Sequence, residues 1–296
     1  MTPGDYTTRP PSAANVAGPA PEFPWPKPFR AALMPAFDVD GESIWLGFDA
    51  MSEQRLVTRS YGGYEARVGL PKILQALESR GVRATFFITG WALDAHPALC
   101  ERVLREGHEV AHHGYWHHKP EPGRPEVMAD ELDRGLEALK RVLGVEPLGY
   151  RAPYGENTDE GLAMLRARGM VYSSSFRDDI RPYRHVLADG SAGPVEIPVN
   201  FAFDDFGYNV THSRYPRTLV SREHVVAIWK DELEQTLEWG GVVSMVLHPQ
   251  ASGRPKGFRI MTEFLDFALR QDGLWIATGA EIAQHFQSCE RTRKTT

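Results

Sequence analysis

The run Gly107-His108-Glu109-Val110-Ala111-His112-His113-Gly114-Tyr115-Trp116-His117-His118 contains five of the 11 histidines of the chain. Imidazole is the commonest side-chain metal ligand at neutral pH, so this clustering indicates a metal site. The pair Val110–Ala111 is typical of the end of a buried strand, and Gly114 allows a sharp turn directly after it. Because His113 and His117 are four residues apart, one helical turn after the strand is predicted to place both on one face. A solvated loop that happens to be rich in histidine is the alternative.

The composition excludes several classes of protein. A chain of 296 residues with 42% hydrophobic content can bury one large core, and α/β barrels of this length are commonly a single domain. The formal charge of -6 and the lack of a long basic run argue against nucleic acid or an anionic membrane as partner. Neither a membrane-spanning apolar stretch nor an N-terminal signal is visible, so a cytoplasmic protein is expected. Cys100 and Cys289 form no CxxC pair, and Cys100 is expected in the core.

The chain divides into three parts. Residues 1–30 are rich in Pro, Ala and Gly and are predicted to form an extended N-terminal arm. Residues 31–288 are predicted to be one catalytic domain, with a long ordered insertion at residues 41–68, and residues 289–296 a flexible tail. Three aromatic side chains of the arm are expected to pack on the domain or on a neighbouring subunit: Phe23, Trp25 and Phe29.

Strand and helix patterns alternate along the predicted domain. The predicted strands are 31–37, 83–88, 109–112, 148–150, 171–173, 195–199, 242–247 and 274–277. The predicted helices include 69–77 with Pro71 at its start, 96–106, 126–143, a helix capped by Thr158, 222–239 and 280–286. Strands separated by helices of this length pair in parallel, with right-handed connections. About seven such units favour an α/β barrel over an open sheet, although the pattern leaves closure undecided.

Polar residues follow several of these strands, where parallel barrels place their active sites. They are Asp38, Asp40, the histidine run, Arg151 and His248. Asp38 and Asp40 are two apart, so both side chains point the same way on an extended backbone, and one can bind a metal while the other accepts a proton. An Asx-type turn or loop cap is the alternative. Asp40, His113 and His117 would leave one zinc position open for water, which is the arrangement of a catalytic site.

Arg151 and His248 each have a functional and a structural interpretation. The permanent charge of a guanidinium would hold Asp38 ionised and oriented, whereas a surface salt bridge is the alternative for Arg151. His248 ends a buried strand and precedes a proline, which suits a general acid for a leaving amine. A core histidine bonded to the backbone is the competing interpretation.

The chain resembles the polysaccharide deacetylase family of metal-dependent hydrolases, from about Leu33 to Phe286. Four motifs carry the resemblance, in chain order: Phe37-Asp38-Val39-Asp40, His113-Gly114-Tyr115-Trp116-His117, Arg151-Ala152-Pro153-Tyr154 and Leu247-His248. The resemblance implies a distorted (β/α) TIM-like barrel and the hydrolysis of carbon–nitrogen bonds other than peptide bonds. A metal-activated water would attack the carbonyl carbon of an amide.

The resemblance also implies roles for individual residues. It implies Asp38 as catalytic base, Arg151 as the residue that orients it, and His248 as the acid. The backbone N–H of Tyr154 would contribute to the oxyanion hole. A divalent metal, foremost Zn²⁺, would be held by Asp40, His113 and His117. Two further candidates for contacts with substrate or oxyanion are Glu42 and Trp116.

Departures from the family pattern bear on the substrate. Val39 interrupts the Asp-Asp-Gly of classical members. Several segments instead resemble an intracellular branch with cyclic-imide hydrolases, allantoinase-like enzymes and peptidoglycan deacetylase-like proteins: residues 172–175, 178–183, 196–199, 203–206 and 252–255. The branch implies a homo-oligomer, a dimer or tetramer, that acts on a small amide, an imide or an N-acetylated sugar.

Three alternatives remain beside a metal-dependent hydrolase. In a metal-independent, allantoinase-like hydrolase the histidines would bind substrate directly. A non-haem iron oxygenase also uses two histidines and a carboxylate, but the alternating α/β pattern argues against it. A non-catalytic binding module would be expected to have lost Asp38, Arg151 or His248, and all three are present. His112 and His118 are expected behind the ligands or facing substrate, and His108 to be structural.

Overall fold

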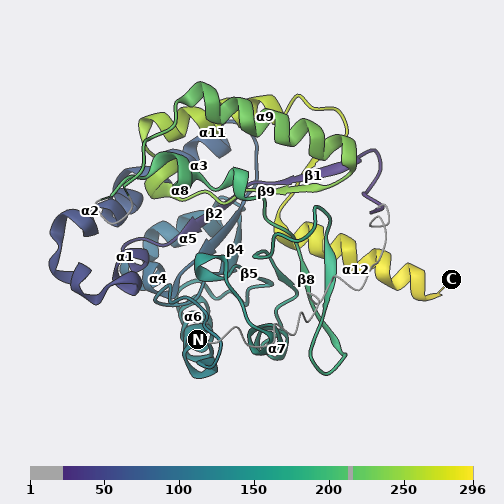
Figure 1. Ribbon diagram of the computed structural model, residues 1–296, viewed down its shortest axis with the longest axis horizontal. Coiled ribbons are helices and arrows are strands. Elements are labelled where there is room, and N and C mark those ends of the chain that lie inside the picture. Colours follow the sequence, from purple (N-terminus) through teal and green to yellow (C-terminus); the bar gives the residue numbers. More distant parts are fainter. Residues whose placement is uncertain (1–22, 213–215, 296) are drawn as a thin grey trace, which may run out of the picture.

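The computed structural model describes residues 23–212 and 216–295 and contains two sheets with helices on both sides (Figure 1). The larger sheet has the spatial order β2 (Ala36–Val39), β3 (Thr85–Ile88), β4 (Glu109–His112), β5 (Gly149–Tyr150), β6 (Tyr172–Ser173), β8 (Ala192–Glu196) and β7 (Tyr183–Val186). The smaller sheet has the order β10 (Leu274–Ile276), β1 (Ala31–Met34) and β9 (Val242–Ser244). Strands separated by helices pair in parallel, so the predicted α/β class is confirmed.

The predicted strand 31–37 forms two strands rather than one. Pro35 lies between β1 and β2 and has no N–H to donate to a ladder. The chain therefore leaves the smaller sheet at this point and enters the larger one. Phe37 then pairs with Phe86 on one side and, through an isolated parallel bridge, with Leu247 on the other. The barrel is distorted where the two sheets meet, and this junction places Leu247 beside β2.

One strand was missed, and it is antiparallel. β7 runs against β8, with Tyr183 opposite Glu196, so the larger sheet is not wholly parallel as predicted. The alternation in β7 is masked by the polar residues Arg184 and His185, and no apolar run marks it in the sequence. A short connection with Gly190 at positive φ joins the two strands, which is the geometry of a hairpin rather than of a crossover.

The predicted insertion at residues 41–68 is helical and continuous with the next helix. It contains α1 (Ser43–Phe48), η1 (Ala50–Gln54), α2 (Leu56–Tyr64) and the π-helical turn η2 (Glu65–Gly69), and it leads into α3 (Leu70–Glu78). Pro71 lies in the first turn of α3, as the sequence predicted, and the π turn joins α2 directly to that turn. The N–H of Leu70 donates to the carbonyl of Glu65, five residues back, one step before the proline that cannot donate.

Most of the other helices agree with the sequence pattern. They are α4 (Gly90–Ala95), α5 (Pro97–Arg105), α6 (Pro125–Leu143), η3 (Pro153–Gly155), α7 (Asp159–Ala167), η4 (Phe201–Phe203), α8 (Asp205–Asn209), α9 (Arg222–Trp239), α10 (Pro249–Ser252), α11 (Pro255–Ala268) and α12 (Gly279–Thr295). Thr158 caps α7 by accepting from the N–H of Gly161 at 3.0 Å, as predicted. The predicted tail is wrong as far as Thr295, because residues 289–295 continue α12. No helix of the described ranges is long and apolar enough to cross a membrane.

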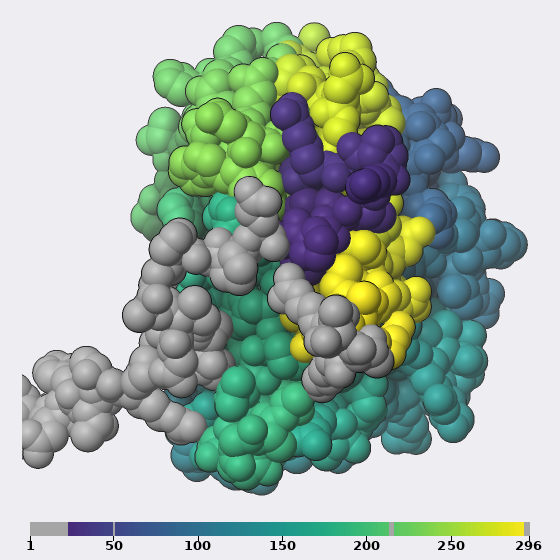
Figure 2. All heavy atoms as spheres, turned by 90° about the vertical axis from the view of Figure 1, so that its right-hand side faces the viewer, coloured from purple at the N-terminus to yellow at the C-terminus, as the bar shows by residue number. Residues whose placement is uncertain are grey.

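The end of the predicted arm packs on the domain. Phe29 stacks on Trp275, and the indole N–H of Trp25 donates to the carbonyl of Gly240 at 2.8 Å. Figure 2 shows the first described residues, in purple, seated against the yellow C-terminal helix. The arm's first 22 residues lie outside the described part of the chain. Cys100 is buried in the core, as expected.

Candidate active site

Strand register brings the predicted residues to one edge of the larger sheet. Val39 is paired with Ile88, Ile88 with His112, and His112 with Tyr150. The residues that follow β2, β4 and β5 are Asp40, His113 and Arg151, so all three emerge side by side. Leu247 pairs with Phe37 and brings His248 to the same edge. The expectation that strand ends gather these side chains is confirmed.

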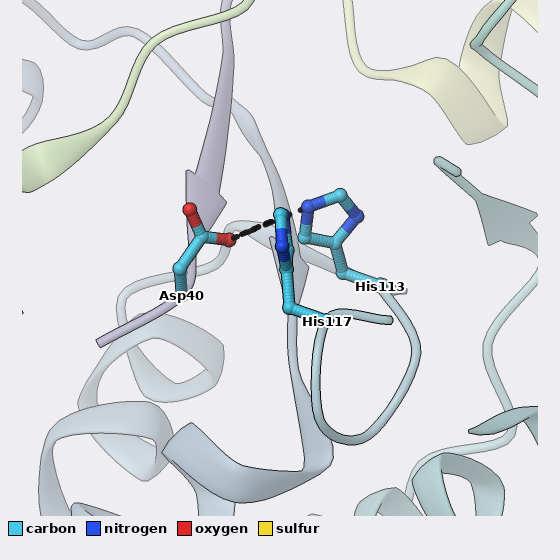
Figure 3. A group of neighbouring side chains, drawn as sticks. All are labelled: Asp40, His113 and His117. Atoms are coloured by element: carbon cyan, nitrogen blue, oxygen red, sulfur yellow. Dashed lines mark ion pairs between the residues drawn. The ribbon is translucent and has the colours of Figure 1, made fainter. Parts of the chain in front are cut away.

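Asp40, His113 and His117 form a group that could hold a metal ion (Figure 3). Oδ1 of Asp40 is 3.4 Å from Nε2 of His113 and 3.7 Å from Nε2 of His117. All three residues are buried, and their ligand atoms lie within 4.8 Å of one another. The two carboxylate oxygens of Asp40 and Nε2 of His113 have no hydrogen-bond partner among the described residues. Buried polar atoms are normally satisfied, so this convergence of unpaired ligand atoms fits a divalent cation.

A hydrogen bond to the backbone carbonyl of Arg151 fixes the tautomer of His113. Its Nδ1 lies 2.8 Å from the carbonyl oxygen of Arg151, which can only accept, so Nδ1 carries the hydrogen and Nε2 is left with its lone pair toward Asp40. Metal-binding histidines characteristically have such a bond from the other ring nitrogen. The backbone of β5 therefore prepares His113 as a ligand.

Charge and burial shift the pKa values of this group in different directions. Burial alone would raise the pKa of Asp40, but the charges of His117, His113 and His248 lower it well below its usual range. Burial lowers the pKa of His117 to about 4 despite the neighbouring Asp40. An ionised carboxylate and a neutral imidazole are the forms that bind a metal.

The loop that carries both histidines is not the helical turn that the sequence predicted. Residues 113–118 have no regular structure, and His117 has a φ of 61°, which is unusual for a residue with a Cβ. The two imidazoles converge because the loop curls back on itself, as Figure 3 shows. The predicted convergence is thus found, but through a different backbone path.

Glu131 of α6 anchors this loop by accepting hydrogen bonds from its backbone. Its buried carboxylate accepts hydrogen bonds from the N–H groups of Tyr115 and Trp116, each at 2.9 Å, and lies 3.0 Å from Nδ1 of His118. Gly114 permits the approach, because a Cβ at that position would lie 2.8 Å from Oε2 of Glu131. Sequence reasoning missed Glu131, since in a helical pattern it is indistinguishable from the exposed acids of α6.

Asp38 and Arg151 form a buried ion pair. Nη1 of Arg151 donates to Oδ1 of Asp38 at 2.7 Å, and Oδ2 of Asp38 lies 3.9 Å from Nε2 of His113. The rest of the guanidinium donates to the carbonyl of Ser174 and to the hydroxyls of Ser174 and Ser244. Arg151 is therefore buried and anchored on several sides, which rules out the surface salt bridge weighed as its alternative.

His248 lies across the site and is bound to Asp205, a residue that sequence reasoning did not single out. Nδ1 of His248 is 2.8 Å from Oδ1 of Asp205, and its backbone N–H donates to the same carboxylate. Burial alone would lower the pKa of His248, but the hydrogen bond and charge of Asp205 and the charge of Asp40 raise it well above its ordinary value. His248 is therefore held in its protonated form, with Nε2 4.0 Å from Oδ2 of Asp40.

The remaining histidines of the run are structural. Nδ1 of His112 accepts from the N–H of Gly114 at 2.9 Å, and its Nε2 lies 3.0 Å from the carbonyl of Leu132. Burial lowers the pKa of His112 to about 4. Nδ1 of His108 accepts from the N–H of Ala84, so the prediction for His108 is confirmed. His112 supports the turn behind the ligands.

A cavity of about 480 Å³ opens above these groups. Its polar wall includes Asp38, His113, His117, Arg151, Ser174, Ser175, Arg177, Asp204, Arg217 and His248. Its aromatic wall includes Trp45, Phe48, Tyr154, Phe201, Phe206 and Tyr208. Tyr154 has a φ of 58° within η3, and its ring lies 4.6 Å from that of His117. The backbone of this turn thus stands beside the candidate metal ligands.

Glu42 and Trp116 are not where the sequence predicted. Glu42 immediately precedes α1, and its Oε2 lies 3.5 Å from Nε2 of His96, away from the cavity wall. Trp116 is turned outward, because its N–H is bound to Glu131, and its ring packs against Tyr115 and under Arg134. Proximity in sequence to a ligand does not fix the direction of a side chain in a loop.

Known proteins resemble the chain in sequence and in structure. The family model described as polysaccharide deacetylase matches residues 38–173, which include all candidate residues except His248. The peptidoglycan deacetylase of Helicobacter pylori is 25% identical over 276 residues, or 84% of this chain and 94% of its own.

Solved structures match over nearly the whole chain. A Mycobacterium smegmatis protein classed with the polysaccharide deacetylases has a TM-score of 0.87 and 33% identity, covering 92% of this chain and 96% of its own. The PuuE allantoinase has a TM-score of 0.79 at 20% identity, covering 96% and 98%, so it shares the fold. The distorted single-domain barrel that the sequence predicted is confirmed by these neighbours.

Proposed function

Because this chain belongs to the polysaccharide deacetylase family, we propose that it is a metal-dependent hydrolase that cleaves the C–N bond of a small amide or imide. As a member of the family it is a hydrolase of carbon–nitrogen bonds other than peptide bonds. The observation that carries the finer proposal is the convergence of unpaired ligand atoms on Asp40, His113 and His117. The ion pair of Asp38 and the Asp205-bound His248 flank that point.

We propose Zn²⁺ as the metal. One carboxylate and two imidazoles with a further position left open are the ligand set of a catalytic zinc site. When bound, such an ion supplies a Lewis acid that lowers the pKa of water toward neutrality and polarises a carbonyl group. The ligands would be Asp40, His113 and His117.

Asp38 and His248 would each carry out one of the two proton transfers. Asp38 would take a proton from the attacking water through Oδ2, because Arg151 occupies Oδ1. His248 would give a proton from Nε2 to the leaving nitrogen, since Asp205 holds Nδ1 and stabilises the imidazolium. The N–H of Tyr154 would face the carbonyl oxygen.

The cavity supports a small substrate. Its volume of about 480 Å³ and its aromatic wall suit a compact ring or a single sugar better than a polymer. N-acetylated sugars remain the competing class, since a relative is named a peptidoglycan deacetylase. The homo-oligomer implied by the resemblance remains a prediction, which light scattering on the purified protein would test.

Metal analysis combined with a substrate panel tests the proposal. The panel sets N-acetylated sugars against succinimide-like rings and allantoin. Asp40→Ala and His117→Ala are expected to lose both bound metal and turnover, whereas Asp38→Asn is expected to keep the metal and lose turnover. His224→Ala on α9 is the matched control. Turnover of the metal-stripped protein would instead favour the metal-independent, allantoinase-like alternative.

A further inference from the structure

Arg177 brings to the cavity wall a positive charge that no carboxylate neutralises within the described ranges. The residue follows β6, next to the Ser174–Ser175 segment that contacts Arg151. Its Nη1 donates to the carbonyl oxygens of Gly155 at 3.2 Å and Ser175 at 3.3 Å. Carbonyl acceptors position a guanidinium but do not cancel its charge.

Arg177 uses only one of its three guanidinium nitrogens in hydrogen bonds. Both of its hydrogen bonds come from Nη1, and neither Nε nor Nη2 has a partner among the described residues. The Nε–Nη2 edge of a guanidinium matches the two oxygens of a carboxylate in a bidentate pair. Nη1 therefore anchors Arg177, and the Nε–Nη2 edge, which best recognises a carboxylate, stays available.

Gly155 lets this guanidinium lie against the turn that carries Tyr154. A Cβ at Gly155 would come within 2.4 Å of Nη2 of Arg177, so any other residue would displace it. The φ of 66° at Gly155 is also one that glycine adopts without strain. Because the ring of Tyr154 contacts that of His117, Arg177 is placed in a fixed relation to the candidate metal ligands.

Two other charged pairs line or adjoin the cavity. Asp38 is paired with Arg151, and His248 with Asp205. Arg177 is exposed at the rim of the same cavity. The rim therefore offers a cationic group to an anion of the substrate.

We propose that Arg177 binds a carboxylate of the substrate, so that the compound hydrolysed is a small amide, imide or cyclic ureide that carries a carboxylate beside the bond to be cleaved. This inference rests on the proposed function and names the substrate class of the same site. Tyr154 and the metal ligands act on the carbonyl, while Arg177 fixes the other end of the molecule and selects it by charge.

Matched pairs of compounds that differ by a carboxylate test the proposal. Dihydroorotate is compared with dihydrouracil, and N-acetylmuramic acid with N-acetylglucosamine, on the metal-loaded protein. The wild type is expected to prefer the carboxylate member of the pair that it hydrolyses by roughly 10- to 100-fold in kcat/KM, the range of a charge-assisted contact. Arg177→Met is expected to abolish this preference, with the loss in kcat/KM falling mainly on the carboxylate member of the pair.

Two further variants separate recognition from loop support. Arg177→Lys keeps the charge but loses the fork, and is expected to recover only part of the preference. Arg166→Met, on the exposed side of α7, is the control for loss of an arginine. Equal losses on both members of a pair in Arg177→Met, or a wild-type preference for the neutral member, would overturn the proposal.

Absence of any turnover would refute the proposed function rather than the anion site. In that case the same pairs are titrated into the wild-type protein by calorimetry. Tighter binding of the carboxylate member that Arg177→Met abolishes supports the contact. Equal binding of both members, or no binding of either, overturns it.

Discussion

Glu131→Gln is expected to loosen the loop that carries the candidate metal ligands. The carboxylate accepts from the N–H groups of Tyr115 and Trp116 and pairs with His118. Glutamine has nearly the same volume, but it replaces one acceptor oxygen with an NH₂ group that faces backbone donors. Both N–H groups bond Oε2, whose place the amide oxygen can take. The NH₂ group then replaces Oε1, and the contacts of that oxygen with the N–H of Trp116 at 3.1 Å and with His118 are lost.

The size of the effect follows from those bonds. A hydrogen bond to a charged group contributes about 1.5–3 kcal/mol, and a buried donor left without a partner costs a similar amount. With the contacts of Oε1 lost and the two bonds to Oε2 weakened by loss of charge, the free energy of unfolding is expected to fall by roughly 2–4 kcal/mol. Part of this energy holds His117 at its positive φ, so metal affinity is expected to fall by about 10- to 100-fold.

Competition of the purified protein with a chromogenic chelator measures the metal affinity, and thermal unfolding of the metal-free protein measures the stability. Excess metal is expected to restore most of the turnover of Glu131→Gln, because the proposed base Asp38 and the proposed acid His248 are untouched. Glu137→Gln, an exposed acid on the same helix, is the control. If Glu131→Gln lowers stability while the metal dissociation constant stays unchanged, Glu131 supports the fold and does not position the ligands.

Two further predictions concern the acid and the sheet. Asp205→Asn removes the partner that raises the pKa of His248. In the wild type, the stability that this pair contributes is fully present below the ordinary pKa of histidine. It is lost as the pH rises through the raised pKa of His248. The alkaline limb of kcat/KM should therefore move to lower pH in this variant, and an unmoved limb would remove His248 from the role of acid. Gly149→Ala places a Cβ 2.0 Å from Cζ of the buried Tyr172 and should destabilise by at least about 1–3 kcal/mol in thermal unfolding. Gly207→Ala makes only an ordinary contact, 3.9 Å from Nη1 of Arg217, and is the control, so equal melting temperatures would contradict the packing argument.

The residues at the carboxyl edge of the sheet could be predicted from the sequence, because the strands that end there appear as local apolar runs. Buried strands appear as short apolar runs, and parallel pairing then fixes which residues follow them at a common edge. Asp40, His113 and Arg151 were identified in this way before any contact between them was known. The first strand was the exception, since the pattern could not reveal that Pro35 divides it between two sheets.

The supports of the site were not predictable from pattern because they lie far away in sequence. Asp205 is 43 residues from His248, and Glu131 is 15 residues from Trp116. Each is one acid among the 39 of the chain. The segment 203–206 that contains Asp205 indicated a branch of the family but not a contact with His248, and nothing around Glu131 distinguishes it from the other acids of its helix. The positive φ of His117 was hidden for the same reason, since the contacts that stabilise it come from α6 rather than from the loop itself.

Glu65 shows how the π-helical turn serves the site. The turn delivers its carboxyl to the strand end, where it accepts from the N–H of Gly41 at 2.7 Å. Burial and the charge of Asp40 raise the pKa of Glu65 well above its usual range, so this carboxyl is neutral beside the ionised ligand. A second ionised acid at that place would compete for the metal or repel Asp40.

The buried acids around the site therefore have distinct tasks. Glu65 is neutral and fixes the backbone after Asp40, Glu131 fixes the loop of the two histidines, and Asp205 keeps His248 protonated. Among the buried acids of the described ranges, Asp40 alone has both carboxylate oxygens without a hydrogen-bond partner. This makes Asp40 the acid best placed to bind the proposed metal together with the two imidazoles.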